Sequence, residues 1–176
     1  MEFTRSEIAR LIADVTGRRL EPVLSTLRNA AVDSMLIPTR GGERNKTARY
    51  PLREAVRAYI LTEIHSFGLI FADLARLNER LNKPVIADDF TNSPGTALDE
   101  IIHAAQIGRD FSIYCRVGME NGEYRARFSF AARNARVDAT LDLLNDTKDV
   151  TTLRVPAATL AGEILAEVLA EVAAER

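Results

Sequence analysis

Two short amphipathic helices separated by a turn are predicted within the first 32 residues, and this pattern restricts the fold more than any other feature of the chain. Thr4 and Glu7 have the spacing of a capping box, and Gly17 is placed to end the first helix. The second helix is predicted to begin at Pro22, where a missing N–H group costs nothing. The apolar positions of the two helices are Ile8, Leu11, Ile12, Val15, Val23, Leu24, Leu27, Ala31 and Val32. Because the free face of the second helix is polar and basic, the pair indicates a helix-turn-helix.

A short basic hairpin is predicted directly after the two helices. Residues 36–39 and 47–50 favour extended structure, and Gly41-Gly42 favours a turn between them. The segment from Arg40 to Arg49 carries four bases against one acid. This composition excludes a core position, so the tip is either a solvated loop or a wing that lies along DNA phosphates.

Two further helices are predicted to close the N-terminal unit. The first runs from Leu52 to Phe67 with Gly68 at its end, and the second runs from Ala72 to Leu81. The inner face of the longer helix is expected to consist of Leu52, Ala55, Val56, Tyr59, Ile60, Ile64 and Phe67.

The formal net charge of −2 conceals opposite charges at the two ends of the chain. The segment from Arg18 to Arg57 has nine bases and four acids, a net charge of +5. From Val137 onward there are three bases and eight acids, a net charge of −5. A basic end suggests a polyanionic partner such as DNA. The alternative is chance clustering of charge on solvated faces.

Four short motifs accompany this order of helices and hairpin: Ser25-Thr26-Leu27-Arg28, Leu36-Ile37-Pro38-Thr39-Arg40, Arg49-Tyr50 and Gly68-Leu69. Together they resemble the winged helix-turn-helix of the MerR-type regulators, over about residues 3–77. The resemblance implies that the second helix enters the major groove and that the hairpin contacts the phosphate backbone. The DNA-binding residues expected on this basis are Arg18, Arg19, Ser25, Arg28, Asn29, Arg40, Arg44, Asn45, Lys46, Arg49 and Arg53.

Beyond residue 82 the pattern changes to a second, smaller α+β unit. We expect a winged helix-turn-helix domain at 1–82, a linker or loop at 83–95, and an α+β domain at 96–176 for dimerisation or for binding a ligand or partner. The overall fold class is therefore α+β.

The second unit is predicted to contain a helix, a small antiparallel sheet and a closing helix. Thr96 is placed to cap the first helix, and Glu120-Asn121-Gly122-Glu123 is a strong hairpin signal between two alternating segments. Further strands are predicted around Val137–Leu143 and Val150–Val155, and a helix from Pro156 to Ala174. The side chains expected inside that helix are Leu160, Ile164, Leu165, Val168, Leu169 and Val172.

The C-terminal helix has three interpretations: it covers its own sheet, which we favour, it forms a dimer interface, or its Glu residues are solubilising charge. Arginines of the hairpin form a second basic cluster, which we expect to be paired internally or solvated; an acidic ligand is the alternative. These arginines are Arg116, Arg125, Arg127, Arg133 and Arg136.

No constellation for catalysis or for holding a metal or cofactor can be assembled from the sequence. His65 and His103 lie on separate predicted helices, and Cys115 is the single cysteine and is placed on the inward side of a strand. Asp88-Asp89 alone is more typical of a solvated loop than of a cation site. We therefore expect a protein that is not an enzyme and has no cofactor. No apolar run is long enough for a membrane span, and a cytoplasmic location is the default expectation.

The function predicted from the sequence is sequence-specific binding of double-stranded DNA in transcriptional regulation, by a homodimer. The second domain would then dimerise or bind a protein partner or a small-molecule effector. The alternatives are a protein-interaction adaptor built on a winged helix and a phage DNA packaging or recombination factor.

Overall fold

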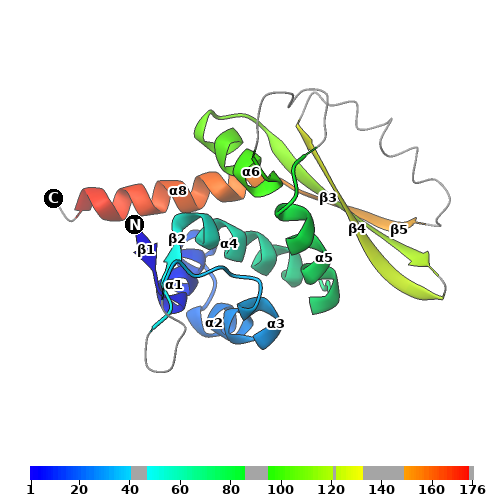
Figure 1. Ribbon diagram of the computed structural model, residues 1–176, viewed down its shortest axis with the longest axis horizontal. Helices are drawn as coiled ribbons and strands as arrows, with labels where there is room; N and C mark the ends of the chain where they lie inside the picture. The colour runs from blue at the N-terminus through cyan, green and yellow to red at the C-terminus, as the bar shows by residue number, and fades with distance from the viewer. Residues whose placement is uncertain (41–46, 86–94, 121, 133–148, 175–176) are drawn as a thin grey trace. The chain divides into compact units, whose positions relative to one another are not determined.

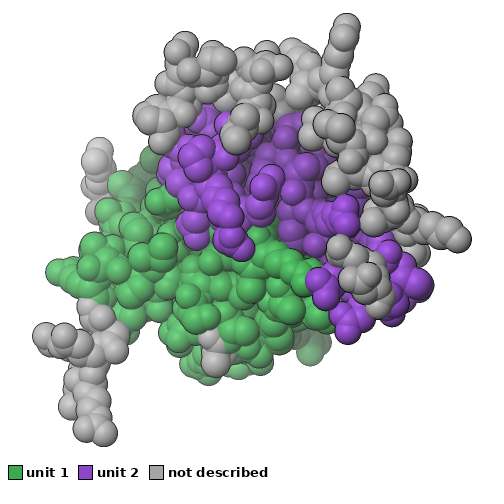
Figure 2. All heavy atoms as spheres, turned by 45° about the vertical axis from the view of Figure 1, so that its right-hand side comes forward, with its two compact units in different colours: residues 1–78, 160–176 green, residues 79–159 purple. Residues whose placement is uncertain are grey.

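The computed structural model describes residues 1–40, 47–85, 95–120, 122–132 and 149–174 (Figure 1). The chain divides into two compact units. Unit 1 comprises Met1–Asn78 and Leu160–Arg176, and unit 2 comprises Glu79–Thr159 (Figure 2). The described residues contain helices and two small antiparallel sheets, which confirms the α+β class.

The first helix of unit 1, α1 (Arg5–Thr16), begins and ends as predicted. The Thr4 hydroxyl accepts from the Glu7 N–H, and the Glu7 carboxylate accepts from the Thr4 N–H at 2.5 Å, which completes the capping box. Gly17 ends the helix with φ 66°, a left-handed conformation that favours glycine.

The second helix differs from the prediction at both ends. α2 (Leu20–Arg28) begins two residues before Pro22, which is tolerated because the first-turn N–H groups have no intrahelical acceptor. It stops at Asn29, whose backbone is extended, and a separate short helix α3 (Ala30–Asp33) follows. The Asn29 side-chain oxygen accepts from the Ala31 N–H at 3.0 Å, so this residue ends one helix and caps the next.

The predicted hairpin is present at its base, and a strand that was not predicted extends the pairing. Arg40 and Arg49 form an antiparallel bridge, with hydrogen bonds from Thr39 N to Arg49 O (2.8 Å) and from Arg49 N to Arg40 O (2.9 Å). The tip, residues 41–46, lies outside the described residues. β2 (Tyr50–Pro51) pairs antiparallel with β1 (Glu2–Phe3) at the start of the chain.

The long helix α4 (Leu52–Ser66) is the centre of unit 1 and contacts α1, α2, β1 and β2. Its side chains from Glu54 to Thr62 are all buried, so it has no solvated face over that stretch. Phe67, expected on the inner face, is instead 55% exposed because it lies beyond the last turn. α5 (Phe71–Leu81) follows, beginning one residue before the predicted start, and its Leu74, Leu77 and Leu81 are buried.

Unit 2 contains one described sheet, with strand order β4-β3-β5, and the helix α6 (Ala97–Gln106) against β3. Thr96 caps α6 in a second capping box with Asp99. β3 (Phe111–Glu120) and β4 (Glu123–Ala132) form the predicted hairpin, and Gly122 has φ 84° in its turn. β5 (Asp149–Val155) pairs antiparallel with β3. The strand predicted around Val137–Leu143 lies outside the described residues.

The C-terminal helix α8 (Ala157–Ala174) has the predicted bounds to within one residue, but it is shared between the units. From Leu160 onward it belongs to unit 1, whereas the sequence suggested that it covers the sheet. Ala161, Ile164 and Val168 are buried, while Leu169, expected inside, is 69% exposed. The helix is apolar on more than one side, so its periodicity alone does not select the buried face. Separate functions for residues 1–82 and 96–176 stay a prediction.

Candidate nucleic-acid interface

The exposed face of α2 carries the side chains expected to contact DNA bases. Val23, Leu24 and Leu27 are buried, which leaves Ser25 and Arg28 exposed on the opposite side of the helix. Arg19, at the N-cap of α2, is also exposed. Within the part of the chain that the structure describes, no acidic side chain pairs with Arg19 or Arg28.

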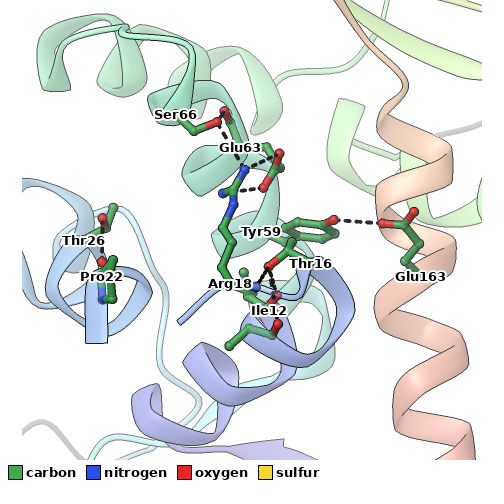
Figure 3. A network of polar contacts seen from close by, with 10 residues as sticks. Ile12, Thr16, Arg18, Pro22, Thr26, Tyr59, Glu63, Ser66 and Glu163 are labelled. Carbon is green, nitrogen blue, oxygen red and sulfur yellow. Dashed lines mark hydrogen bonds and ion pairs between the residues drawn. The ribbon is translucent and has the colours of Figure 1, made fainter. Parts of the chain in front are cut away.

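Arg18, by contrast, is held against the protein. From the α1–α2 turn it reaches α4, where its Nη1 lies 2.7 Å from Oε1 of Glu63 and its Nη2 donates to the Ser66 hydroxyl at 3.4 Å (Figure 3). In the same turn, the Thr16 hydroxyl donates to the Ile12 carbonyl at 2.6 Å. Arg18 therefore fixes the turn to α4, which is a structural role that the prediction of a DNA contact did not include.

The two arginines at the root of the hairpin each face a carboxylate of the N-terminal segment. Arg40 Nε lies 2.8 Å from Glu2 Oε2, and Arg49 Nη1 lies 3.3 Å from Glu7 Oε2. The pKa of the Glu7 carboxyl is below its ordinary value, first because it accepts the backbone N–H of Thr4 and in smaller part because of the Arg49 charge. The Arg40 side chain is nevertheless 74% exposed, so its ion pair is weak and exchangeable.

The other residues predicted to contact DNA are engaged in the fold, half-buried, or outside the described residues. Asn29 has its side-chain oxygen engaged at the start of α3, which gives it a structural role. Arg53 is half-buried in the first turn of α4. Arg44, Asn45 and Lys46 lie outside the described residues.

A buried ionic network behind the hairpin was missed by sequence reasoning. Arg57 is fully buried on α4, and its Nε lies 2.8 Å from Oε2 of Glu54, which is 2% exposed. The same Glu54 oxygen accepts the Ile37 N–H at 3.1 Å, and Arg57 Nη1 donates to the side-chain oxygen of Asn78 on α5 at 2.5 Å. The network thus joins α4 to the chain just before the hairpin and to α5. The one sequence signal was the i, i+3 spacing of Glu54 and Arg57.

A second network holds the other side of the hairpin root. The Asp33 carboxylate pairs with Arg5 and accepts the Tyr50 hydroxyl at 3.4 Å, while Arg5 also donates to that hydroxyl at 3.3 Å. These three residues come from α3, β2 and α1, and Tyr50 is buried. The root of the hairpin is therefore fixed by ionic contacts on both sides.

The residues considered as possible catalytic or metal-binding groups do not come together in a site among the described residues. His65 stacks on Phe71 at a centroid distance of 4.7 Å, and its Nδ1 lies 2.8 Å from the Leu69 carbonyl oxygen. His103 is exposed, and Cys115 is buried as predicted. Asp88 and Asp89 lie outside the described residues. Where the structure describes the chain, it contains no group of three or more His, Cys, Asp or Glu that could hold a metal ion.

None of the described helices combines the length and the apolar character needed to cross a membrane. Comparison of the sequence with protein-family models and with curated proteins gave no match.

Proposed function

We propose that unit 1 binds double-stranded DNA, with α2 in the major groove and the hairpin rooted at Arg40 and Arg49 along the phosphate backbone. The biological setting that fits such binding is transcriptional regulation. Helix-turn-helix proteins commonly bind two half-sites as dimers, so a homodimer is part of this proposal.

The observation that carries the proposal is the distribution of ion pairs among the arginines of unit 1. Arginines at structural positions face carboxylates within the fold: Arg5, Arg18, Arg40, Arg49, Arg57 and Arg76. Arg10, Arg19 and Arg28 differ, because they are exposed and form no ion pair with a carboxylate among the described residues, and of these Arg28 projects from the exposed face of α2. An exposed guanidinium at the end of a short helix suits a base edge or a phosphate oxygen.

The hairpin supports the same interpretation through its sequence and its anchoring. The bridge between Arg40 and Arg49 brings the two ends of residues 41–46 together, and that segment contains Arg44 and Lys46. Because both networks fix the root, Arg40 and Arg49 are held at a defined place on unit 1. This is the arrangement needed for phosphate contacts that set the register of α2 on a duplex.

Binding to a pool of random duplexes at several salt concentrations tests the proposal. The wild-type chain should bind at low ionic strength with an affinity that falls steeply with salt, and Arg28→Ala combined with Arg44→Ala should reduce the salt slope by about 2. Arg80→Ala removes an exposed arginine from α5 and is the control expected to change little. Undetectable or salt-independent binding by the wild-type chain would exclude DNA as the target.

A protein-interaction adaptor is the second candidate, and one specific observation favours it. Phe67 and Ile70 are 55% and 60% exposed on either side of Gly68, at the turn between α4 and α5. Two large apolar side chains on a turn fixed by the His65–Phe71 stack are typical of a protein contact. A stable protein partner that survives the Arg28 and Arg44 substitutions and is lost with Phe67→Ser would favour this candidate over DNA binding.

A further inference from the structure

The base of the hairpin and β1 together form a small antiparallel arrangement with two distinct faces. β1 pairs with β2 so that Phe3 lies opposite Tyr50, and both of these side chains are buried. Side chains alternate between the two faces of a strand, so Glu2 and Arg49, each adjacent to one member of this pair, belong to the outward face. Arg40 stands opposite Arg49 in the antiparallel bridge and shares that face. The outward face therefore carries two arginines and a carboxylate.

Each of the two arginines is paired with a carboxylate of the N-terminal segment. Arg40 Nε lies 2.8 Å from Glu2 Oε2, and the backbone of Glu2 is held by the pairing of β1 with β2. Arg49 Nη1 lies 3.3 Å from Glu7 Oε2, and the same oxygen accepts the Thr4 N–H in the capping box of α1. The capping bond therefore keeps the Glu7 carboxylate beside Arg49 even when another anion approaches that arginine.

Both ion pairs are open to solvent, so an outside anion can replace the carboxylate. The Arg40 side chain is 74% exposed, and the side chains of Arg49 and Glu7 are 39% and 49% exposed. Exposed ion pairs contribute little to stability and are screened by salt. A phosphate that contacts either arginine must nevertheless displace a carboxylate and then remain close to that negative charge.

We propose that Glu2 and Glu7 are built-in competitors of DNA, which occupy Arg40 and Arg49 and so weaken the phosphate contacts at the base of the hairpin. Phosphate contacts are independent of base sequence, whereas base contacts come from the exposed face of α2. The consequence is that phosphate contacts alone hold the protein on a duplex less tightly than its arginines would allow. The competition rests on the proposed function for the identity of the outside anion, and it describes how that same site is regulated.

A purely structural role for the two ion pairs predicts a different behaviour. Arg40 and Arg49 stand directly opposite each other, and like charges in this position destabilise a sheet. If Glu2 and Glu7 only offset that repulsion, their removal lowers stability without strengthening the binding of DNA. The affinity for DNA therefore distinguishes competition from a structural role.

The test compares the full chain with Glu2→Gln/Glu7→Gln on a pool of random duplexes, over a range of salt concentrations. Glutamine also serves at the third helical position of a capping box, so the variant keeps the cap of α1 and loses the two charges. The double variant should bind between about 2-fold and about 30-fold more tightly at low salt, the range expected when two exposed ion pairs no longer compete. The gain should be equal for all duplex sequences and should shrink as salt screens the charges.

A matched control separates local competition from the change in net charge. Glu167→Gln/Glu171→Gln removes the same charge from α8, where neither carboxylate forms an ion pair with an arginine among the described residues. This control should bind as wild type does, to within about a factor of 2.

A second comparison asks whether the carboxylates act through the arginines. In the background of Arg40→Gln/Arg49→Gln, removal of Glu2 and Glu7 should give no gain, because no arginine is left to compete for. A gain that persists in this background, or one that the α8 control reproduces, shows that the carboxylates act through net charge alone and overturns the inference.

Thermal unfolding shows whether each variant is folded at the temperature of the binding assay. If the double variant does not fold, Glu2→Gln is measured alone, since Glu2 takes no part in the cap of α1, and a gain of up to about 5-fold is expected. A folded variant that binds no more tightly than wild type overturns the inference alone. Wild type without measurable binding to any duplex refutes the proposed function and the inference with it, so the two failures are distinguishable.

Discussion

The buried pair of Glu54 and Arg57 gives the sharpest test of the structure of unit 1. Glu54→Gln keeps the size and shape of the side chain but removes the Glu54 carboxylate charge from beside the guanidinium of Arg57, which is fully buried. The Ile37 N–H keeps an acceptor in the amide oxygen, so the change acts mainly on charge.

The expected loss is large because the remaining charge has no access to water. Breaking a buried ion pair from one side costs about 3–5 kcal/mol. A domain is stable by only about 5–15 kcal/mol, so the variant loses about a fifth or more of its stability. For a chain of this size, 1 kcal/mol corresponds to roughly 2–4 °C, so the melting temperature should fall by about 6–20 °C.

Replacing both partners separates the charge from the packing. In Glu54→Leu/Arg57→Met neither charge of the pair remains, but the Ile37 N–H and the Asn78 side chain each lose a partner. Two lost hydrogen bonds cost about 1–3 kcal/mol in total, less than Glu54→Leu or Arg57→Met alone, the two single variants of the cycle. The double-mutant cycle should therefore give a coupling energy of several kcal/mol.

Urea unfolding followed by circular dichroism measures the free energies, with the m-value as a check on the unfolded state. Hydrogen exchange of the α4 amides reports on unit 1 separately from unit 2. A loss below about 1 kcal/mol in Glu54→Gln, or a cycle without coupling, would refute the argument that this pair is buried and mutually dependent.

Three further predictions concern single side chains. Glu7→Gln should lower stability at neutral pH, because the pKa of Glu7 in the folded protein lies below its ordinary 4.5. The stabilisation by Glu7 is complete above pH 4.5 and is lost as pH falls through the folded pKa. The melting temperatures of variant and wild type should therefore converge in acid. Burial, and then the hydrogen bond to Glu163, raise the pKa of Tyr59 above its ordinary 10.0. The stabilisation by Tyr59 is therefore complete below pH 10 and is lost as pH rises through the folded pKa. Alkaline titration should destabilise wild type more than Tyr59→Phe. Asn29→Ala removes the cap of α3 and should cost about 1 kcal/mol in urea unfolding, and an unchanged midpoint would argue against its capping role.

Local sequence signals predicted most of the individual elements. The capping boxes at Thr4 and Thr96 place two helix starts correctly, because the side chains that satisfy the first N–H groups are adjacent in sequence. The Asn121-Gly122 turn places the β3–β4 hairpin for the same local reason. In contrast, β1 has only two residues and forms because Tyr50 and Pro51 lie beside it, which no local pattern reports.

The site was predicted less completely than the fold. Sequence identified the cations near the hairpin and on α2, but it did not distinguish Arg28, which has no carboxylate partner among the described residues, from Arg18, which is bound to Glu63. Nor did it find the buried Arg57, since an arginine on a helix is normally assigned to a solvated face. Which charges are used inside the fold depends on tertiary neighbours, and only the structure supplies these. The winged helix-turn-helix assignment and DNA binding stay predictions.

The return of α8 to unit 1 has a consequence for the way the protein is made. The hydroxyl of Tyr59 donates to Glu163 at 2.8 Å across 104 residues of chain, so unit 1 is discontinuous in sequence. At about 5–20 residues per second, the 81 residues from Glu79 to Thr159 separate the synthesis of its two parts by roughly 4–16 s. During that interval the nascent α4 lacks the helix that carries Glu163, and the Tyr59 hydroxyl lacks the acceptor that it has in the finished protein. Packing of unit 1 is thus expected to be completed only after unit 2 has been synthesised.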